Sequence, residues 1–305
     1  MADCQSSPVR IMAWIMPRTI STALCKCLSS VDGMEIWFEL FSYASFVRKE
    51  YEQQTGNKLP MVYEGNEKTV RDAAKRFESL VGTNILPEKV VYHNVQKELE
   101  ASTSKYIFVK EGYMAFPDKK SRQYLPKGFK HVFLIREPHK LFTSYRKAMY
   151  QHLTNVGIRS GDAADEEAFD IGHDDPVMNA NEFYSGITDL WLYVRDNLDP
   201  NPIVINTDDL LADPAGVLEK FCNLTGLPYS DSLLHWDASP DVIKNWIRVS
   251  DNIIKLANAF FETAVLSSSF LPPKPAIPID KLSPDVRKLA KVSMPHFEKI
   301  NQFKI

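Results

Sequence analysis

Short apolar segments alternate with longer segments of helical periodicity along most of this chain. Five apolar segments have the length and content of β-strands: Val9–Met16, Met34–Phe38, Tyr106–Val109, His131–Ile135 and Ile203–Ile205. Helices are expected at Ala23–Ser29, Phe41–Gln54, Glu67–Leu80, Leu141–His152, Glu182–Asn197 and Ala215–Leu224. Apolar strands that alternate with helices are typical of a parallel sheet covered on both faces. The pattern therefore predicts a three-layer α/β fold with a mostly parallel sheet.

The chain shows no internal repeat and no linker long enough to divide it, so we expect one domain over residues 1–305. The core would span about residues 9–270, and residues 271–305 would form a helical tail with a proline-rich break at Pro272–Pro278. An acidic, irregular stretch occupies Gly161–Pro176. We interpret this stretch as a solvated loop; the alternatives are a lid or a surface that favours a cationic acceptor.

Composition changes this picture little. Apolar residues make up 44% and charged residues 25% of the chain, as in an ordinary globular protein. The net charge of −3 does not point to nucleic acid as a partner. The 4 cysteines are too few and too scattered for a disulfide framework, and no apolar run approaches the ~20 residues of a membrane span. We expect a cytoplasmic protein without a membrane partner; its oligomeric state cannot be read from the pattern.

Charged residues follow the predicted strands, at the edge of the sheet where open α/β proteins bind their ligands. The first four strands are followed in turn by Arg18, Glu39, Lys110 and Arg136. Hydroxyl groups accompany Arg18 in the first loop, at Thr19, Ser21 and Thr22. A helix start offers free N–H groups and a partial positive charge, and arginine adds paired donors for phosphate or sulfate oxygens. Three cations beside a helix start therefore predict an anion site.

The first loop occupies the position of a phosphate-binding loop but lacks the G-x-x-x-x-G-K-[ST] pattern, which disfavours a Walker-type nucleotide kinase. No acidic strand end is a clear Mg²⁺ ligand, so we expect no metal in this site. Arginine, hydroxyls and backbone N–H groups suit a sulfuryl group better, because sulfuryl carries less charge in transfer than phosphoryl.

Three segments, PRTISTAL, HVFLIREPHKLFTSYRK and INTDDLLADPAGVLEKFCNLTGLP, together resemble the sulfotransferase family. They look closest to the branch whose bacterial members carry a PRxISTA loop and are sometimes labelled aminotransferase-like, although nothing here suggests pyridoxal phosphate. The resemblance extends in patches from about Ile11 to Phe270. It implies a P-loop-NTPase-like sulfotransferase fold and 3′-phosphoadenosine 5′-phosphosulfate as the sulfuryl donor.

The resemblance also implies roles for individual residues. The loop residues Arg18, Thr19, Ile20, Ser21 and Thr22 match the loop that holds the 5′-phosphosulfate, and Arg18 matches the cation that stabilises the leaving bridging oxygen. Lys110 matches a basic position near the transferred group. The pair that binds the 3′-phosphate corresponds to Arg136 and Ser144. Arg248 and Ser268, the latter within Ser267–Ser269, fall where family members close over the nucleotide, but no RKG-like motif is present.

The sequence departs from the family at two positions. Ile20 stands where many sulfotransferases have glycine, so we expect the backbone to approach the phosphate in a different way. Gly112 stands where many cytosolic members have a histidine base. Our first candidate for the base is Glu39, which lies among aromatic residues that could raise its pKa. Glu111 is second and His152 third.

The aromatic residues near these positions either line an acceptor pocket or belong to the core; they are Trp37, Phe41, Tyr43, Tyr113, Phe116 and Trp246. We interpret the protein as a small-molecule sulfotransferase that acts on a hydroxyl or an amine. A nucleotide-dependent phosphotransferase and a catalytically silent nucleotide-binding protein are the alternatives. The sequence does not identify the acceptor.

Overall fold

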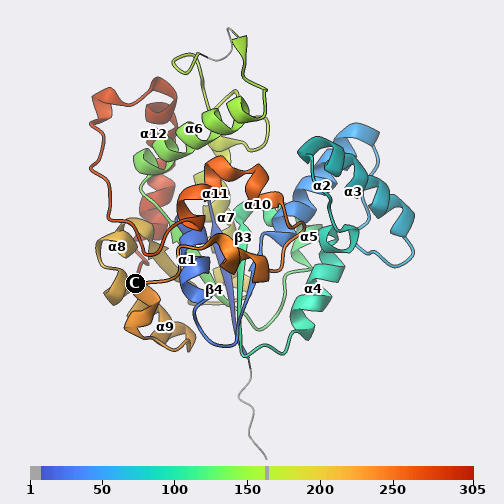
Figure 1. Ribbon diagram of the computed structural model, residues 1–305, viewed down its shortest axis with the longest axis horizontal. Coiled ribbons are helices and arrows are strands. Elements are labelled where there is room, and N and C mark those ends of the chain that lie inside the picture. Colours follow the sequence, from blue (N-terminus) through green and yellow to red (C-terminus); the bar gives the residue numbers. More distant parts are fainter. Residues whose placement is uncertain (1–7, 162–164) are drawn as a thin grey trace, which may run out of the picture.

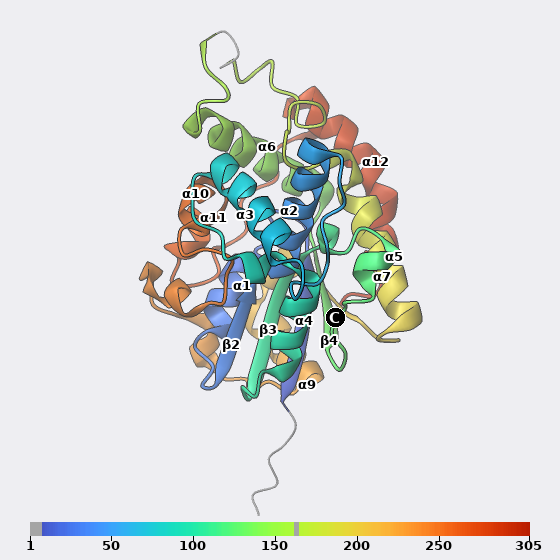
Figure 2. The same cartoon turned by 90° about the vertical axis from the view of Figure 1, so that its right-hand side faces the viewer.

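The computed structural model describes residues 8–161 and 165–305. A parallel five-stranded sheet in the order β2-β3-β1-β4-β5 lies at its centre (Figures 1 and 2). The strands are β1 (Val9–Ile15), β2 (Met34–Phe38), β3 (Tyr106–Gly112), β4 (Lys130–Ile135) and β5 (Ile203–Asn206). Their side chains are almost entirely buried apart from the first residues of β1, β2 and β4. The predicted parallel sheet is therefore confirmed, and all five strands are parallel.

Helices cover both faces of the sheet. The first half of the chain supplies α1 (Ser21–Leu28), α2 (Leu40–Thr55), α3 (Glu67–Val81), α4 (Tyr92–Ala101) and α5 (Lys119–Arg122). The second half supplies α6 (Pro138–Asn155), α7 (Phe183–Asn197), α8 (Thr207–Ala212), α9 (Pro214–Thr225), α10 (Ile253–Leu256), α11 (Asn258–Val265) and α12 (Pro284–Asn301). The connection from β1 to β2 crosses the sheet in the opposite direction to those from β2 to β3 and from β4 to β5. Right-handed crossovers therefore place α1 on one face and α4 and α7 on the other, which confirms the predicted three layers.

The third strand extends beyond its predicted end. β3 pairs with β1 through Gly112, so Lys110 and Glu111 lie opposite Ala13 and Trp14 within the sheet instead of following it. Both side chains are buried, at 1% and 0% exposure. The prediction ended the strand at Val109 because charged residues are rare in buried strands; here both charges have partners, as described below.

The C-terminal segment returns to the sheet. α12 packs against α6 and α7, and the Ile305 N–H donates to the Val204 carbonyl oxygen at 3.1 Å beside β5. At the opposite edge, Ile247 forms a parallel bridge with Trp37 of β2. These additions protect both edge strands from pairing with another chain. In residues 8–161 and 165–305, no helix has the length and apolarity needed to span a membrane.

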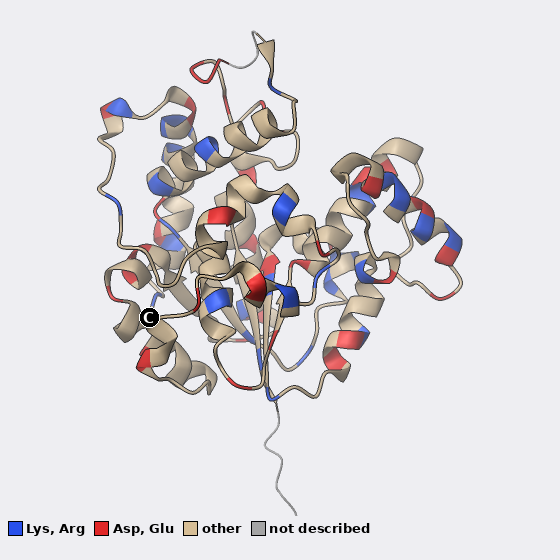
Figure 3. Cartoon of the chain, viewed as in Figure 1, with Lys and Arg blue, Asp and Glu red and all other residues tan. Residues whose placement is uncertain are grey.

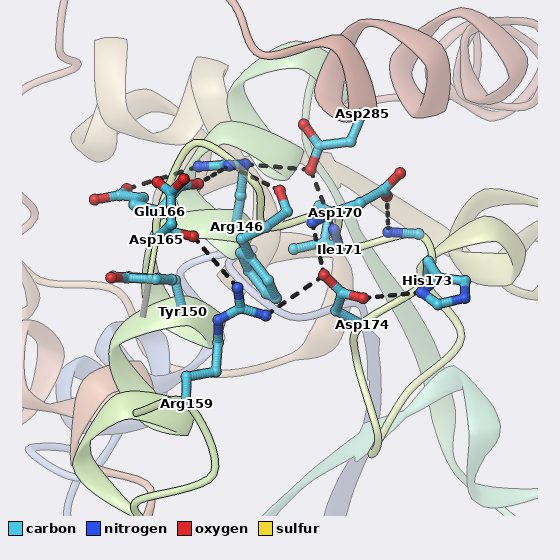
Figure 4. A network of polar contacts seen from close by, with 12 residues as sticks. Arg146, Tyr150, Arg159, Asp165, Glu166, Asp170, Ile171, His173, Asp174 and Asp285 are labelled. Atoms are coloured by element: carbon cyan, nitrogen blue, oxygen red, sulfur yellow. Dashed lines mark hydrogen bonds and ion pairs between the residues drawn. The ribbon is translucent and has the colours of Figure 1, made fainter. Parts of the chain in front are cut away.

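The acidic stretch before α7 is held by arginines of α6 and of the segment after it, except residues 162–164, which lie outside the described residues. Figure 4 shows this network: Arg146 contacts Asp285 at 3.2 Å, and Arg159 contacts Asp174 at 3.4 Å. Cationic residues of α6 and α12 lie beside the acidic segment in Figure 3. Glu166 and Asp174 of this stretch are therefore paired with Arg146 and Arg159, which does not favour its interpretation as a surface for a cationic acceptor.

Candidate functional site

The loop between β1 and α1 has an unusual backbone. Arg18 and Ile20 have φ angles of 69° and 61°, in the left-handed region that glycine adopts easily and other residues rarely do. Between them, the buried Thr19 hydroxyl donates to the Met16 carbonyl oxygen at 2.7 Å and fixes the turn. The loop thus takes a glycine-type conformation without glycine. Ile20 thus adopts the left-handed conformation directly, and how the backbone approaches a phosphate there stays a prediction.

Four α-helices directly follow the carboxyl ends of the strands, and the first turns of three of them have side-chain acceptors. Glu111 accepts from Phe41 N and Ser42 N of α2, Glu137 accepts from Lys140 N of α6, and Asn206 accepts from Asp208 N of α8. Among the described residues, no side chain caps α1, whose N-cap is Ile20. Its first N–H groups therefore need acceptors from elsewhere, and an anion is a suitable one.

Two arginines meet beside the start of α1. The Arg18 Nε donates to Ser144 Oγ at 3.0 Å, and its Nη1 donates to the Phe260 carbonyl oxygen. The Arg136 Nη1 donates to the Arg18 carbonyl oxygen at 3.0 Å, while its buried Nε has no hydrogen-bond partner among the described residues. Burial, and then the charge of Arg136, lower the pKa of Arg18 to about 10. Two crowded guanidinium groups would gain from a bound anion.

The buried Lys110 forms an ion pair with the half-buried Glu39 at the same edge. The Lys110 Nζ also lies 4.0 Å from the centre of the Phe38 ring and 5.5 Å from that of Phe261. Glu39 has a φ of 59°, and its N–H donates to the Lys110 carbonyl oxygen at 2.8 Å. The sequence placed this carboxylate among aromatic side chains; the structure adds a direct cationic partner that sets its position.

Glu111, the second candidate for the base, holds the start of α2. Its carboxylate accepts from Phe41 N at 2.9 Å, from Ser42 N at 2.8 Å and from Ser42 Oγ at 2.7 Å. It is fully buried and does not line the cavity described below. Burial, opposed by these hydrogen bonds, raises the pKa of the Glu111 carboxyl to about 8. Glu111 is therefore a structural carboxylate that fixes the helix following Glu39.

The stability of the protein should fall with rising pH because of Glu111. A carboxyl with a raised pKa in the folded state holds a proton that the unfolded state releases, so its contribution is lost between about pH 5 and pH 8. We expect Glu111→Gln to remove this dependence, so that the wild type loses about 1–3 kcal/mol more than the variant over this range. Urea denaturation of both proteins at pH 5 and at pH 8 measures this difference in the free energy of unfolding. An equal change in the free energy of unfolding between the two pH values in both proteins would contradict the assignment of this dependence to Glu111.

At Gly112, where the resemblance implies a histidine base, a larger side chain would have to displace the side chain of Met114. A Cβ atom on Gly112 would lie 2.2 Å from the Met114 Sδ and 3.2 Å from the Ser42 Oγ. Met114 fills this space and lines the cavity. His152, the third candidate, also lines the cavity, and burial lowers its pKa.

These groups surround one cavity of about 1520 Å³. Most of the predicted site residues line it: Arg18, Ile20, Ser21, Thr22, Glu39, Lys110, Arg136 and Ser144. Thr19, Arg248 and Ser268 do not line it, although Ser267 and Ser269 on either side of Ser268 do. The buried Arg248 instead contacts the Trp246 carbonyl oxygen at 3.3 Å and Asp251 at 3.4 Å. The structure thus brings together eight predicted residues from four strand ends and separates Arg248 from them.

Of the aromatic residues named from the sequence, Tyr43 lines the cavity, and Trp37, Phe41, Phe116 and Trp246 are buried in the core. Tyr113 packs against Phe183, outside the cavity.

Sequence reasoning missed the parts of the cavity wall formed by α3, α10, α11 and most of α2, and it missed two further parts. One is the face of α6 with Lys140 and Lys147. These lysines lie four residues before and three residues after Ser144, and this spacing places all three on one face of the helix. The other is the segment 271–282, which includes Lys274 and reaches the cavity only because the chain folds back toward α12. No local pattern in the sequence signals the second contact.

Comparisons with known proteins give distant relatives. The chain is 23% identical over 239 residues to branched-chain-amino-acid aminotransferase-like protein 2 of Arabidopsis thaliana. This match covers 75% of the chain but 32% of that protein, so the chain spans about a third of the length of the curated relative. No protein-family model matches the chain.

Two solved structures resemble the chain at 15% sequence identity. The sulfotransferase domain from the Synechococcus PCC 7002 olefin synthase aligns with 96% of this chain and 97% of its own, with a TM-score of 0.45. The sulfotransferase domain from the curacin biosynthetic pathway aligns with 94% and 98%, with a TM-score of 0.43. Because these similarities are low, we infer the function of the chain from its own site.

Proposed function

We propose that this chain is a single-domain sulfotransferase that moves the sulfuryl group of 3′-phosphoadenosine 5′-phosphosulfate to a small acceptor in the cytosol. The observation that carries the proposal is the uncapped start of α1, flanked by Arg18, Lys110 and Arg136. Backbone N–H groups, two guanidinium groups and one ammonium group fit the oxygens of an anionic donor. The cavity exceeds the ~300–1,000 Å³ usual for one ligand, which leaves room for a nucleotide and an acceptor.

The two phosphate groups of the donor would occupy neighbouring positions. The loop 17–22 and the start of α1 would hold the 5′-phosphosulfate. Arg136 and Ser144 would hold the 3′-phosphate, with Lys140 and Lys147 on the same α6 face as Ser144. Arg18 would exchange its contact with Ser144 for the phosphosulfate. Arg248 and Ser268 do not line this cavity, and we propose that the segment 271–282 covers the nucleotide in their place.

The transfer needs a base for the acceptor hydroxyl and a cation beside the leaving oxygen. Glu39, held by Lys110, would accept the proton of the acceptor hydroxyl while the hydroxyl oxygen forms its bond to sulfur. The bond between sulfur and the bridging oxygen breaks, and that oxygen leaves with its electron pair on the 5′-phosphate. Arg18 and the N–H groups of α1 would stabilise this negative charge. A silent binding protein has no need of the Glu39–Lys110 pair.

We propose the PRxISTA-loop branch for this chain. The aminotransferase-like name of the Arabidopsis relative agrees with the labels of that branch. That name belongs to a protein about three times as long, and we propose no aminotransferase chemistry here.

A thermal-shift experiment tests the donor. We expect 3′-phosphoadenosine 5′-phosphate to raise the melting temperature more than adenosine 5′-phosphate does, and more than ATP with Mg²⁺, because only the first supplies both phosphate positions. Ser144→Ala should reduce the difference between the first two. Failure of 3′-phosphoadenosine 5′-phosphate to stabilise the wild type would overturn the proposal, and preferential stabilisation by ATP with Mg²⁺ would favour a phosphotransferase. Donor binding without a sulfated product in a mass-spectrometric screen of hydroxyl compounds would favour a silent binding protein.

The backbone of Ile20 gives a second test. Ile20→Gly should keep the affinity for 3′-phosphoadenosine 5′-phosphate within about threefold, because glycine adopts the observed φ without strain. Ile20→Pro fixes φ near −65° and should weaken binding at least about tenfold by reorienting the loop. Isothermal titration calorimetry measures both affinities, and thermal melting checks that both variants fold. Equal binding by the two variants would show that the left-handed backbone is not needed.

A further inference from the structure

Helix α6 presents two different stripes to the cavity. Lys140, Ser144 and Lys147 repeat at helical spacing on one stripe, and Tyr145, Met149 and His152 repeat on the next. Since neighbouring positions on an α-helix differ by about 100°, the two stripes line adjoining parts of the cavity. The polar stripe accompanies the Arg18–Ser144 contact and belongs to the proposed donor site. The second stripe has no role in that site.

The second stripe continues into a mostly apolar wall, to which α2 also contributes the polar side chains Lys49, Glu50 and Gln53. Helices α2 and α3 add Phe46, Phe77 and Val81, and the segment before α7 adds Met178. Figure 1 shows α2 and α3 on one side of α11 and the segment 271–282 on the other, and Figure 2 shows α2 and α3 in front of the sheet. The apolar part of the cavity and the part lined by the segment 271–282 therefore lie in different directions from the β1–α1 loop.

Exposed apolar side chains surround the apolar part. They come from α3, α6 with the residues after it, the segment before α7, and α10: Leu80 (62% exposed), Val156 (49%), Ile158 (62%), Val177 (43%) and Leu256 (38%). Single exposed apolar residues are common on protein surfaces, but five from four segments that line one cavity mark a place where apolar surface is covered by a ligand.

The charges at the inner end of the apolar part of the cavity favour one kind of reacting group on the acceptor. Arg18 and Lys110 are both cations, and the Glu39 carboxylate is already paired with Lys110. A protonated amine would meet two like charges there, and among the described residues Glu39 is the one carboxylate in ion-pair contact with Lys110. A hydroxyl is neutral and can donate its proton to Glu39. On these observations, which rest on the proposed sulfotransferase function, we infer that the acceptor is a long apolar alcohol, with its hydroxyl at Glu39 and its chain along α2, α3 and α6 toward the exposed rim.

A series of unbranched alcohols tests this inference. With 3′-phosphoadenosine 5′-phosphosulfate as donor, kcat/KM should rise from butan-1-ol to dodecan-1-ol by about fourfold per methylene until the chain reaches the rim. Octan-1-ol should exceed octylamine at least about tenfold. A flat or falling series, or a preference for the amine or for serine or glucose, overturns the inference. If 3′-phosphoadenosine 5′-phosphate fails to bind, the proposed function falls and this inference with it; donor binding with a flat series removes the inference alone.

A matched pair of surface variants locates the chain of the alcohol. Ile158→Gln changes an exposed rim residue, so it should fold normally and raise KM for dodecan-1-ol at least about fivefold. It should leave KM for butan-1-ol and for the donor unchanged. Leu224→Gln changes a residue of α9 with 53% exposure that does not line the cavity, and it should alter none of these values. Equal effects of the two variants, or no effect of Ile158→Gln on dodecan-1-ol, would place the alcohol elsewhere and overturn the inference.

Discussion

Replacement of Arg18 by alanine is expected to lower kcat/KM for sulfuryl transfer by about 10²–10³, the usual loss when one donor to a developing negative charge is removed. Arg18 lies between the start of α1 and Ser144, where the leaving 5′-phosphate would carry its charge. Because alanine retains a Cβ, the variant keeps the backbone preference of a non-glycine residue and changes mainly the guanidinium group. Mass-spectrometric quantification of the sulfated product measures the effect.

Arg76→Ala is the matched control for this prediction. Arg76 lies on α3, pairs with Asp72 on the surface and does not line the cavity, so its loss should leave activity within about twofold of the wild type. Thermal melting of both variants excludes unfolding as the cause of lost activity. Arg18→Ala with activity close to that of Arg76→Ala would show that Arg18 does not act on the leaving group.

Glu39→Gln is expected to lower kcat by about 10²–10⁴, because the amide cannot accept the proton of the acceptor hydroxyl. The affinity for 3′-phosphoadenosine 5′-phosphate should change little, since the arginines that would hold its phosphates remain in place. The ion pair with Lys110 is lost, so calorimetric binding and thermal melting accompany the rate measurement.

Glu50→Gln tests whether the position of the carboxylate matters. Glu50 also lines the cavity but lies eleven residues further along α2, about 16 Å at 1.5 Å per residue. It should keep near wild-type kcat. Unchanged turnover in Glu39→Gln would eliminate Glu39 as the base, and His152 would then be the cavity-lining candidate to test.

The sequence predicted the fold well, and it grouped residues that line one cavity, because both depend on local patterns. Apolar strands that alternate with helices specify a parallel sheet, and the carboxyl ends of parallel strands meet at one edge. Arg18, Glu39, Lys110 and Arg136 could therefore be grouped before any contact was known. Ser144 was implied by the resemblance, and its place two turns into the helix after Arg136 agrees with that assignment.

Other features depend on contacts between distant segments, and the sequence did not reveal them. Glu111 looked like a reacting carboxylate, but its partners on α2 occur seventy residues earlier in the chain and make it a structural residue. Arg248 was chosen by its place in the sequence, whereas the segment 271–282 reaches the cavity by folding back toward α12. The six aromatic residues could not be divided into wall and core, because burial depends on which helix packs over each strand.

The left-handed conformation of Ile20 has a consequence for how such proteins are found. A β-branched residue costs about 1–2 kcal/mol in this conformation, so the short loop would not adopt it as an isolated peptide. The rest of the fold imposes the shape, through the Thr19 turn and the Arg136 contact with the Arg18 carbonyl group. Searches that require glycine in a phosphate-binding loop would pass over this chain, although its backbone has the conformation for which glycine is selected.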